Sequence, residues 1–90
     1  MKALLTCGCG AVPTYVQTQY KIKHPKEEIP TLYISRKGYK FLDTLPPNSE
    51  AHRFVAAVLK KRGRYAYSID ANEDGTLNEV YDFMKKKRVA

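Results

Sequence analysis

The sequence predicts an α+β domain, with a mostly antiparallel sheet of four or five strands and two helices packed largely on one face. Three observations predict it. Residues Ser49 to Arg62 have the apolar spacing of a helix, Thr14 to His24 alternate in the manner of a strand, and Arg64 to Asp70 form a short aromatic and β-branched run. With 90 residues, of which 43% are hydrophobic and 28% charged, the chain has the size and composition of one globular domain over residues 1–90.

The predicted helix from Ser49 to Arg62 has a signal at each end. Two prolines stand just upstream, Asn48 or Ser49 can cap the first free backbone amides, and Gly63 follows the last turn. Apolar residues recur at three- and four-residue spacing, which draws one stripe along the helix. The stripe consists of Ala51, Phe54, Val55, Val58 and Leu59.

The N-terminal half predicts strands. Lys2 to Thr6 is a short apolar run suited to an opening strand, and Thr14 to His24 predicts a half-buried strand with a polar outer face. Thr31 to Ser35 and Tyr39 to Leu42 are two further short runs. Because Gly38 lies between them, where a tight turn needs positive φ, we expect these two runs to pair antiparallel.

The C-terminal segment from Thr76 to Arg88 predicts a second helix. Thr76 is followed three residues later by Glu79, the reciprocal capping arrangement of a helix N-terminus, and four lysine and arginine residues suit the other end of the dipole. A hairpin strand that starts at Leu77 is the alternative.

Two cysteines lie one residue apart in Cys7-Gly8-Cys9-Gly10, which ends the opening strand, and Pro13 opposes helix immediately afterwards. A pair this close builds no disulfide framework, and a complete single-chain zinc site lacks two further ligands at a suitable spacing. We interpret the cysteines as small residues at a strand end. A zinc ion shared across a dimer and a redox-active Cys-x-Cys pair are the alternatives.

The segment Asp70 to Asn78 resembles a calcium-binding loop of the EF-hand or dockerin type. Oxygen-bearing side chains occupy its first, third and fifth positions, and Gly75 occupies the sixth. The twelfth position, where such loops place a bidentate carboxylate, is Tyr81. We therefore interpret the segment as a polar turn and predict no metal and no cofactor.

The formal charge of +7 favours an anionic partner, and the cations fall in clusters. Phosphate binding needs cations that converge on one face, and tyrosines can add base stacking. The leading prediction is a small basic module that contacts nucleic acid or a nucleic-acid complex. Its predicted phosphate contacts are Lys21, Lys23, Arg53, Lys60, Lys61, Arg62, Arg64, Lys85, Lys86, Lys87 and Arg88.

The alternative is a small inhibitor or adaptor, of the kind made by phages and mobile elements, that docks on an acidic protein surface through the same charge and tyrosines. The sequence contains no phosphate loop, paired-histidine motif or nucleophile elbow, so we expect no enzyme. No run has the roughly 20 apolar residues of a membrane span. We expect a cytoplasmic protein, present as a monomer or small homo-oligomer.

Overall fold

The computed structural model describes residues 1–89, and five strands form one sheet in the order β2-β1-β3-β4-β5. The pair β1/β2 is parallel and the other three pairs are antiparallel, so the predicted fold class is confirmed. In chain order the elements are β1 (Lys2–Thr6), α1 (Val12–Lys23), β2 (Thr31–Ile34), the short 3₁₀ helix η1 (Ser35–Lys37), α2 (Gly38–Asp43), α3 (Glu50–Leu59), β3 (Ala66–Ala71), β4 (Leu77–Asp82) and β5 (Lys87–Arg88).

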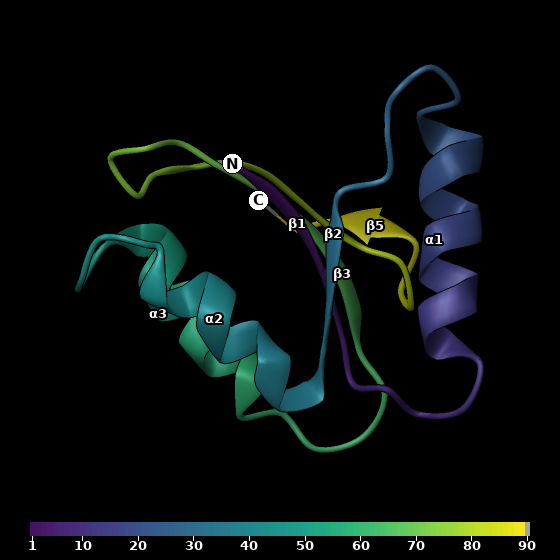
Figure 1. Ribbon diagram of the computed structural model, residues 1–90, viewed down its shortest axis with the longest axis horizontal. Helices are drawn as coiled ribbons and strands as arrows, with labels where there is room; N and C mark the ends of the chain where they lie inside the picture. Colours follow the sequence, from purple (N-terminus) through teal and green to yellow (C-terminus); the bar gives the residue numbers. More distant parts are fainter. Residues whose placement is uncertain (90) are drawn as a thin grey trace.

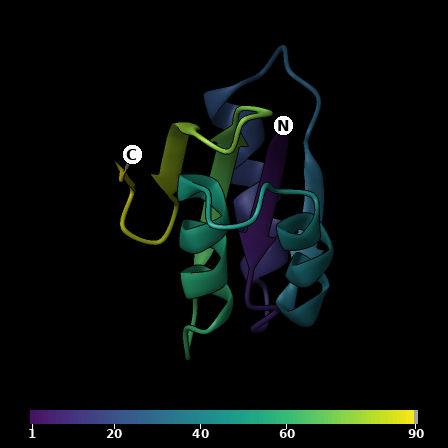
Figure 2. The ribbon, with the colours of Figure 1, turned by 90° about the vertical axis from the view of Figure 1, so that its left-hand side faces the viewer.

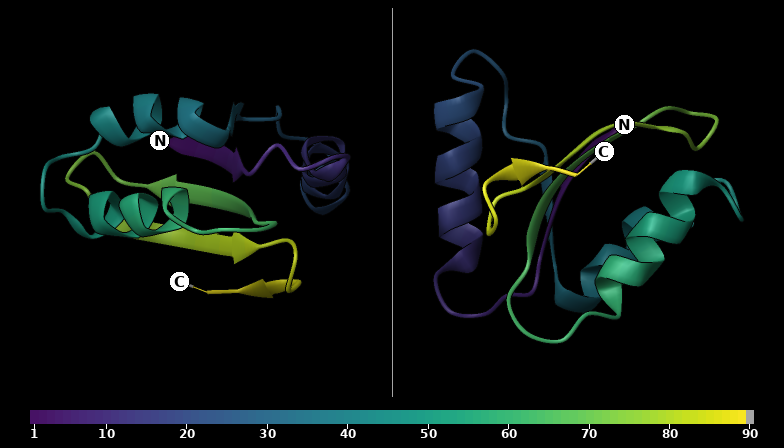
Figure 3. Two further views of the ribbon diagram at one scale, coloured as in Figure 1. Left: turned by 90° about the horizontal axis from the view of Figure 1, so that it is seen from below. Right: turned by 180° about the vertical axis from the view of Figure 1, so that it is seen from behind.

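The helices cover both faces of the sheet (Figures 1 and 3). Helices α2 and α3 lie together on one face, while α1 covers the opposite face alone. Each face has its own apolar core: Leu5 packs with the α2 and α3 side, and Leu4 packs with the α1 side. Strand β1 is thus buried on both faces. The predicted pair of helices on one face is therefore present as α2 and α3. Helix α1 covers the opposite face in addition.

The prediction of a strand from Thr14 to His24 is wrong, because these residues belong to helix α1 and its C-cap. Its alternating pattern also contains a four-residue period, and the helix buries Val12, Val16 and Tyr20 while Ile22 stays 67% exposed. Pro13 occupies the first turn, where a proline sacrifices no helical hydrogen bond. Since β1 and β2 are parallel, the chain between them must cross over the sheet, and a helix does so.

The predicted hairpin between Thr31–Ser35 and Tyr39–Leu42 is also wrong. The first run is strand β2, but it pairs with β1, and the second run lies in helix α2. Gly38 has an ordinary helical φ of −59°. A Cβ at Gly38 would collide with the Leu59 side chain, so this glycine permits the close approach of α2 to α3.

The predicted C-terminal helix is wrong, and the alternative strand from Leu77 is what forms. Thr76 does not cap a helix: its backbone and hydroxyl groups donate to the Asp74 carboxylate at 3.0 and 2.7 Å. Gly75, at φ +89°, completes the turn between β3 and β4. Strand β4 then satisfies the open edge of β3, a gain in hydrogen bonds that an isolated helix face cannot supply.

The central helix agrees with the prediction, although it ends three residues earlier. The Ser49 hydroxyl accepts a hydrogen bond from the His52 N–H at 3.1 Å and caps α3. Ala51, Val55 and Val58 are buried, and Phe54 and Leu59 pack against the same core. Figure 2 shows α3 and α2 side by side in front of the sheet.

Candidate functional site

The two cysteines lie just beyond the C-terminal end of β1, where three loops meet. Cys7 directly follows β1, and β2 runs parallel to β1, so the turn after β2 reaches the same end of the sheet. Because β3 is antiparallel to β1, its first residues also lie there: Thr6 pairs with Ile34 on one side and with Ala66 on the other. The topology therefore gathers residues 7–11, 35–37 and 60–65 in one place.

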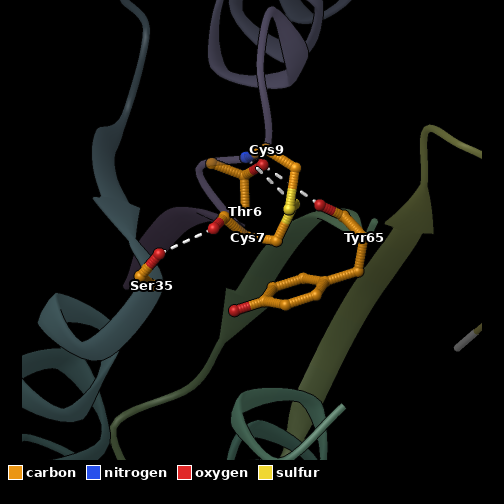
Figure 4. Close-up of a disulfide and its surroundings, with 5 residues drawn as sticks. All are labelled: Thr6, Cys7, Cys9, Ser35 and Tyr65. Atoms are coloured by element: carbon orange, nitrogen blue, oxygen red, sulfur yellow. Dashed lines mark hydrogen bonds between the residues drawn. A yellow bond between two sulfur atoms is a disulfide. The ribbon is translucent and has the colours of Figure 1, made fainter. Parts of the chain in front are cut away.

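Cys7 and Cys9 are joined by a disulfide, with their Cα atoms 5.4 Å apart (Figure 4). Both side chains are half-buried. Gly8, between them, has a φ of +73°, and a Cβ at this position would lie only 2.5 Å from Cγ2 of Ile34. The loop can bring the two sulfur atoms together because a residue without a side chain stands between them.

Hydrogen bonds fix the loop to its neighbours. The Ser35 hydroxyl donates to the Cys7 carbonyl at 2.6 Å, and the Cys7 N–H donates to the Tyr65 carbonyl at 3.4 Å (Figure 4). The Cys9 N–H donates to Sγ of Cys7 at 3.2 Å. A donor aimed at sulfur favours the thiolate over the thiol, so Cys7 is the better placed of the two to carry negative charge after reduction.

A cavity of about 450 Å³ opens beside the disulfide. Arg36, Lys61, Tyr39 and Tyr65 contribute to its wall, and the described lining contains no aspartate or glutamate. Burial, and to a smaller extent the neighbouring Tyr39, raises the pKa of Tyr65, so this phenol remains a neutral donor at physiological pH. Cations beside a cysteine stabilise its thiolate and increase its reactivity.

Helix α1 begins beside the same loop. The Cys9 carbonyl accepts a hydrogen bond from the Val12 N–H at 3.4 Å, which ties the cysteine loop to the first turn. This helix has no acidic residue in its first turn and no side-chain cap. The positive end of its dipole is therefore not neutralised locally, and it acts in the same direction as the cations of the cavity.

The predicted cations of residues 60–64 lie in the loop from α3 to β3. Lys61 lines the cysteine cavity, and its Nζ donates to the Tyr67 hydroxyl at 2.6 Å. Arg64 lines a different cavity of about 270 Å³, together with Tyr15 of α1 and Met84. Lys60 and Arg62 are exposed. Lys61 and Arg64 therefore line different cavities, and the cations of residues 60–64 do not converge on one site.

The second predicted cluster, residues 85–88, forms the β4–β5 hairpin instead of a helix end. All four side chains are exposed, and Nη2 of Arg88 donates to the Asn78 carbonyl at 3.2 Å. Lys86 shares a cavity of about 140 Å³ with Lys23. Met84, in the turn of this hairpin, lines one cavity with Arg64 and with Val12 and Tyr15 of α1.

Lys21 and Lys23 belong to the last turn of α1, not to a sheet face. The Nζ of Lys21 donates to the Glu27 carbonyl at 3.0 Å. Lys23 lies 3.9 Å from the Glu79 carboxylate and 3.6 Å above the Tyr81 ring. Arg53 is exposed on α3, on the other side of the sheet. The predicted residues are thus not brought together as one patch.

The loop that resembles a calcium site is a β-hairpin turn. Its polar groups bond to each other: Nδ2 of Asn72 donates to the Thr76 hydroxyl at 2.7 Å and to Oδ1 of Asn78 at 2.9 Å. The hydrogen bonds from Thr76 lower the pKa of Asp74. Within residues 1–89, no three histidine, cysteine or acidic side chains form a group suited to a metal ion.

The sequence reasoning missed Arg36 and Tyr39 as site residues, and it counted Tyr65 only among the tyrosines that can stack on bases. Arg36 and Tyr39 were placed in a hairpin, where nothing connects them with the cysteines. The only signal that points to them is the parallel pairing of β1 with β2, which requires α1 to be read as a helix.

A scan against protein-family models and searches of curated proteins and solved structures find no match to this chain. Among the described residues, no helix is both long and apolar enough to cross a membrane.

Proposed function

We propose that this protein carries out thiol–disulfide exchange through Cys7 and Cys9. The observation that carries the proposal is the position of the bonded pair, half-buried at the mouth of a cavity that Arg36 and Lys61 line. A structural disulfide of a small domain usually joins distant segments, whereas this one closes a loop of three residues. A partly exposed cysteine pair whose cavity is lined by cations has the electropositive surroundings of a reactive cysteine site.

The exchange proceeds in two balanced steps. A substrate thiolate attacks one cysteine sulfur, the Cys7–Cys9 bond breaks, and the other cysteine leaves as a thiolate. A second substrate thiolate attacks the substrate sulfur of this mixed disulfide and releases the oxidised substrate. The protein has then gained two electrons and, once both thiolates are protonated, two protons. Reduced protein performs the reverse steps on a substrate disulfide.

Cys7 is the cysteine whose thiolate the site favours. The Cys9 N–H that donates to Sγ of Cys7 is a backbone group, so it persists when the Cys9 side chain is replaced. We expect Cys9→Ser, which keeps Cys7, to react with iodoacetamide near pH 7 faster than Cys7→Ser. Equal rates across the pH range would refute this assignment.

The test of the function uses dithiothreitol, which is neutral, as reductant and a protein disulfide as substrate. The wild-type protein should accelerate substrate reduction over dithiothreitol alone, and its own pair should be reduced reversibly, as counted by titration of free thiols. The double variant Cys7→Ser/Cys9→Ser is the matched control and should give no acceleration. A wild-type protein no faster than this control would refute the proposal.

Nucleic-acid binding is the second candidate, and one observation favours it. Arg64 and Met84 line one cavity, and Lys86 and Lys23 line another, so the turn of the β4–β5 hairpin adjoins cations of both the α3–β3 loop and α1. Cations spread over several elements suit an extended phosphate backbone, for which charge supplies most of the affinity.

This candidate predicts salt-dependent binding to labelled single-stranded DNA, duplex DNA or RNA. For duplex DNA, the logarithm of affinity should fall by roughly 0.9 per phosphate contact for each log unit of salt. The variant Arg64→Gln/Lys86→Gln should weaken binding, while Cys7→Ser/Cys9→Ser should leave it unchanged. Absence of binding at low salt would refute this candidate and leave an acidic protein partner or solubility as the role of these cations.

A further inference from the structure

We infer that the exchange substrate is a thiol or disulfide that carries a carboxylate close to its sulfur atom. This inference rests on the proposed exchange at Cys7 and Cys9 and names its substrate class. The cavity beside the disulfide, at about 450 Å³, has the size of a site for a small molecule or for one extended segment of a peptide. The charge and the donors of its wall select what enters.

The wall offers positive charge without compensation. Neither Arg36 nor Lys61 forms an ion pair within residues 1–89, and no acidic side chain belongs to the described lining. Lys61 uses one N–H toward the Tyr67 hydroxyl and keeps two for a ligand. Arg36 is exposed in η1, directly after β2, and its planar fork of donors matches a carboxylate in bidentate geometry.

The remaining wall fits the same ligand. Tyr65 lies beside the disulfide (Figure 4), and its buried phenol supplies a neutral O–H donor. Tyr39 is 43% exposed and presents a ring at the rim. Arg36, Lys61 and both cysteines line this one cavity, so a substrate that places its sulfur at the disulfide can place a nearby carboxylate at the cations, as a short mercapto acid does.

The experiment compares three small thiols as reductants of the Cys7–Cys9 disulfide. Mercaptopropionate carries a carboxylate, mercaptoethanol is neutral, and cysteamine carries an ammonium group. Each rate constant is divided by that of the same thiolate with a neutral reference disulfide, which removes intrinsic reactivity. We expect mercaptopropionate to be favoured over mercaptoethanol on the order of tenfold at low salt, with cysteamine slowest, and the preference to shrink as salt rises.

Two matched double variants locate the preference. Arg36→Gln/Lys61→Gln should slow all three thiols, because it also removes the cations that stabilise the leaving thiolate, and it should make their normalised rates equal. Lys21→Gln/Lys26→Gln removes the same charge from the last turn of α1 and the loop after it, at the far end of a helix about 18 Å long, and should retain the preference.

Three outcomes would overturn the inference. Equal normalised rates for the three thiols would remove the anion preference while leaving the exchange itself intact. An equal loss in both double variants would assign the preference to net charge and not to the cavity. If no thiol, mercaptoethanol included, reduces the pair, then the exchange reaction itself is refuted and the substrate class falls with it.

Discussion

Gly8→Ala tests the geometry that brings the two cysteines together, and Gly10→Ala is its internal control. Both glycines have positive φ, +73° and +63°, so alanine at either position pays the cost of left-handed backbone, about 1 to 2 kcal/mol. The two differ in their surroundings. A Cβ at Gly10 meets nothing within 4 Å, whereas a Cβ at Gly8 lies 2.5 Å from Cγ2 of Ile34 and 3.0 Å from Oγ of Ser35.

The steric overlap of a Cβ at Gly8 with Ile34 determines how much more stability Gly8→Ala should lose than Gly10→Ala. Carbon atoms pack best at about 3.5 to 4.0 Å, and forcing a group into a filled site costs about 1 to 3 kcal/mol. We expect Gly10→Ala to lower the free energy of unfolding by about 1 to 2 kcal/mol and Gly8→Ala by about 2 to 5 kcal/mol. Any shift of Ser35 also disturbs its hydrogen bond to the Cys7 carbonyl, so Gly8→Ala should change the rate of disulfide reduction more than Gly10→Ala does.

The assay is urea unfolding of the oxidised proteins at fixed pH, read by circular dichroism, with dithiothreitol reduction measured on the same samples. In a background of Ile34→Ala, which removes the clashing Cγ2, the penalty of Gly8→Ala should fall toward that of Gly10→Ala. Equal penalties for the two glycine variants in the wild-type background would show that the cysteine loop does not pack against β2 as described.

Three further predictions concern the framework of the fold. Ser49→Ala removes the cap of α3 and should lower the free energy of unfolding by about 1 kcal/mol in urea unfolding. Phe54→Ala removes a half-buried ring whose centroid lies 5.7 Å from that of Tyr67 and should cost about 2 to 3 kcal/mol in the same assay, less than for a fully buried phenylalanine. Burial, and then the hydrogen bond to Glu27, raises the pKa of Tyr20 from 10.0 to about 12, so the folded state favours the neutral phenol; its contribution to stability should be intact below pH 10 and be lost between pH 10 and 12.

The outcomes that would contradict these predictions are specific. An unchanged unfolding midpoint in Ser49→Ala would mean that the hydroxyl does not cap α3. A loss under about 1 kcal/mol in Phe54→Ala would place this ring outside the packed layer. For Tyr20, the variant Tyr20→Phe should flatten the decline of unfolding free energy above pH 10, and an unchanged slope would assign that decline to other groups.

The sequence by itself determined the elements whose signals are local. Helix α3 has a capping serine and an apolar stripe, and β1 and β3 are short apolar runs between glycine or polar breaks. The sequence therefore predicts the start of α3 to within one residue, although it extends the helix three residues too far, and it predicts both strands to within two residues. The fold class followed from these elements, because a helix with one apolar stripe beside short aromatic strands requires a sheet to cover.

Tertiary structure decided the elements whose patterns fit two periods. The residues of α1 alternate and also repeat every fourth position, and the parallel pairing of β1 with β2 selected the helix. The residues of β4 suit a capped helix, but the unpaired edge of β3 selected a strand. In both segments, hydrogen bonds and burial supplied by distant parts of the chain outweighed the local preference.

The candidate site likewise combines features that are local in the sequence with contacts that only the tertiary structure creates. The sequence supplied the Cys-Gly-Cys loop and a net positive charge, but it could not indicate that Arg36 and Lys61, separated by 25 positions, line one cavity beside the cysteines. That proximity exists because β2 runs parallel to β1 and β3 runs antiparallel to it. The C-terminal ends of β1 and β2 therefore lie beside the N-terminal end of β3. Strand order and direction are set by which edges pair and which faces are covered, and these are properties of the whole fold.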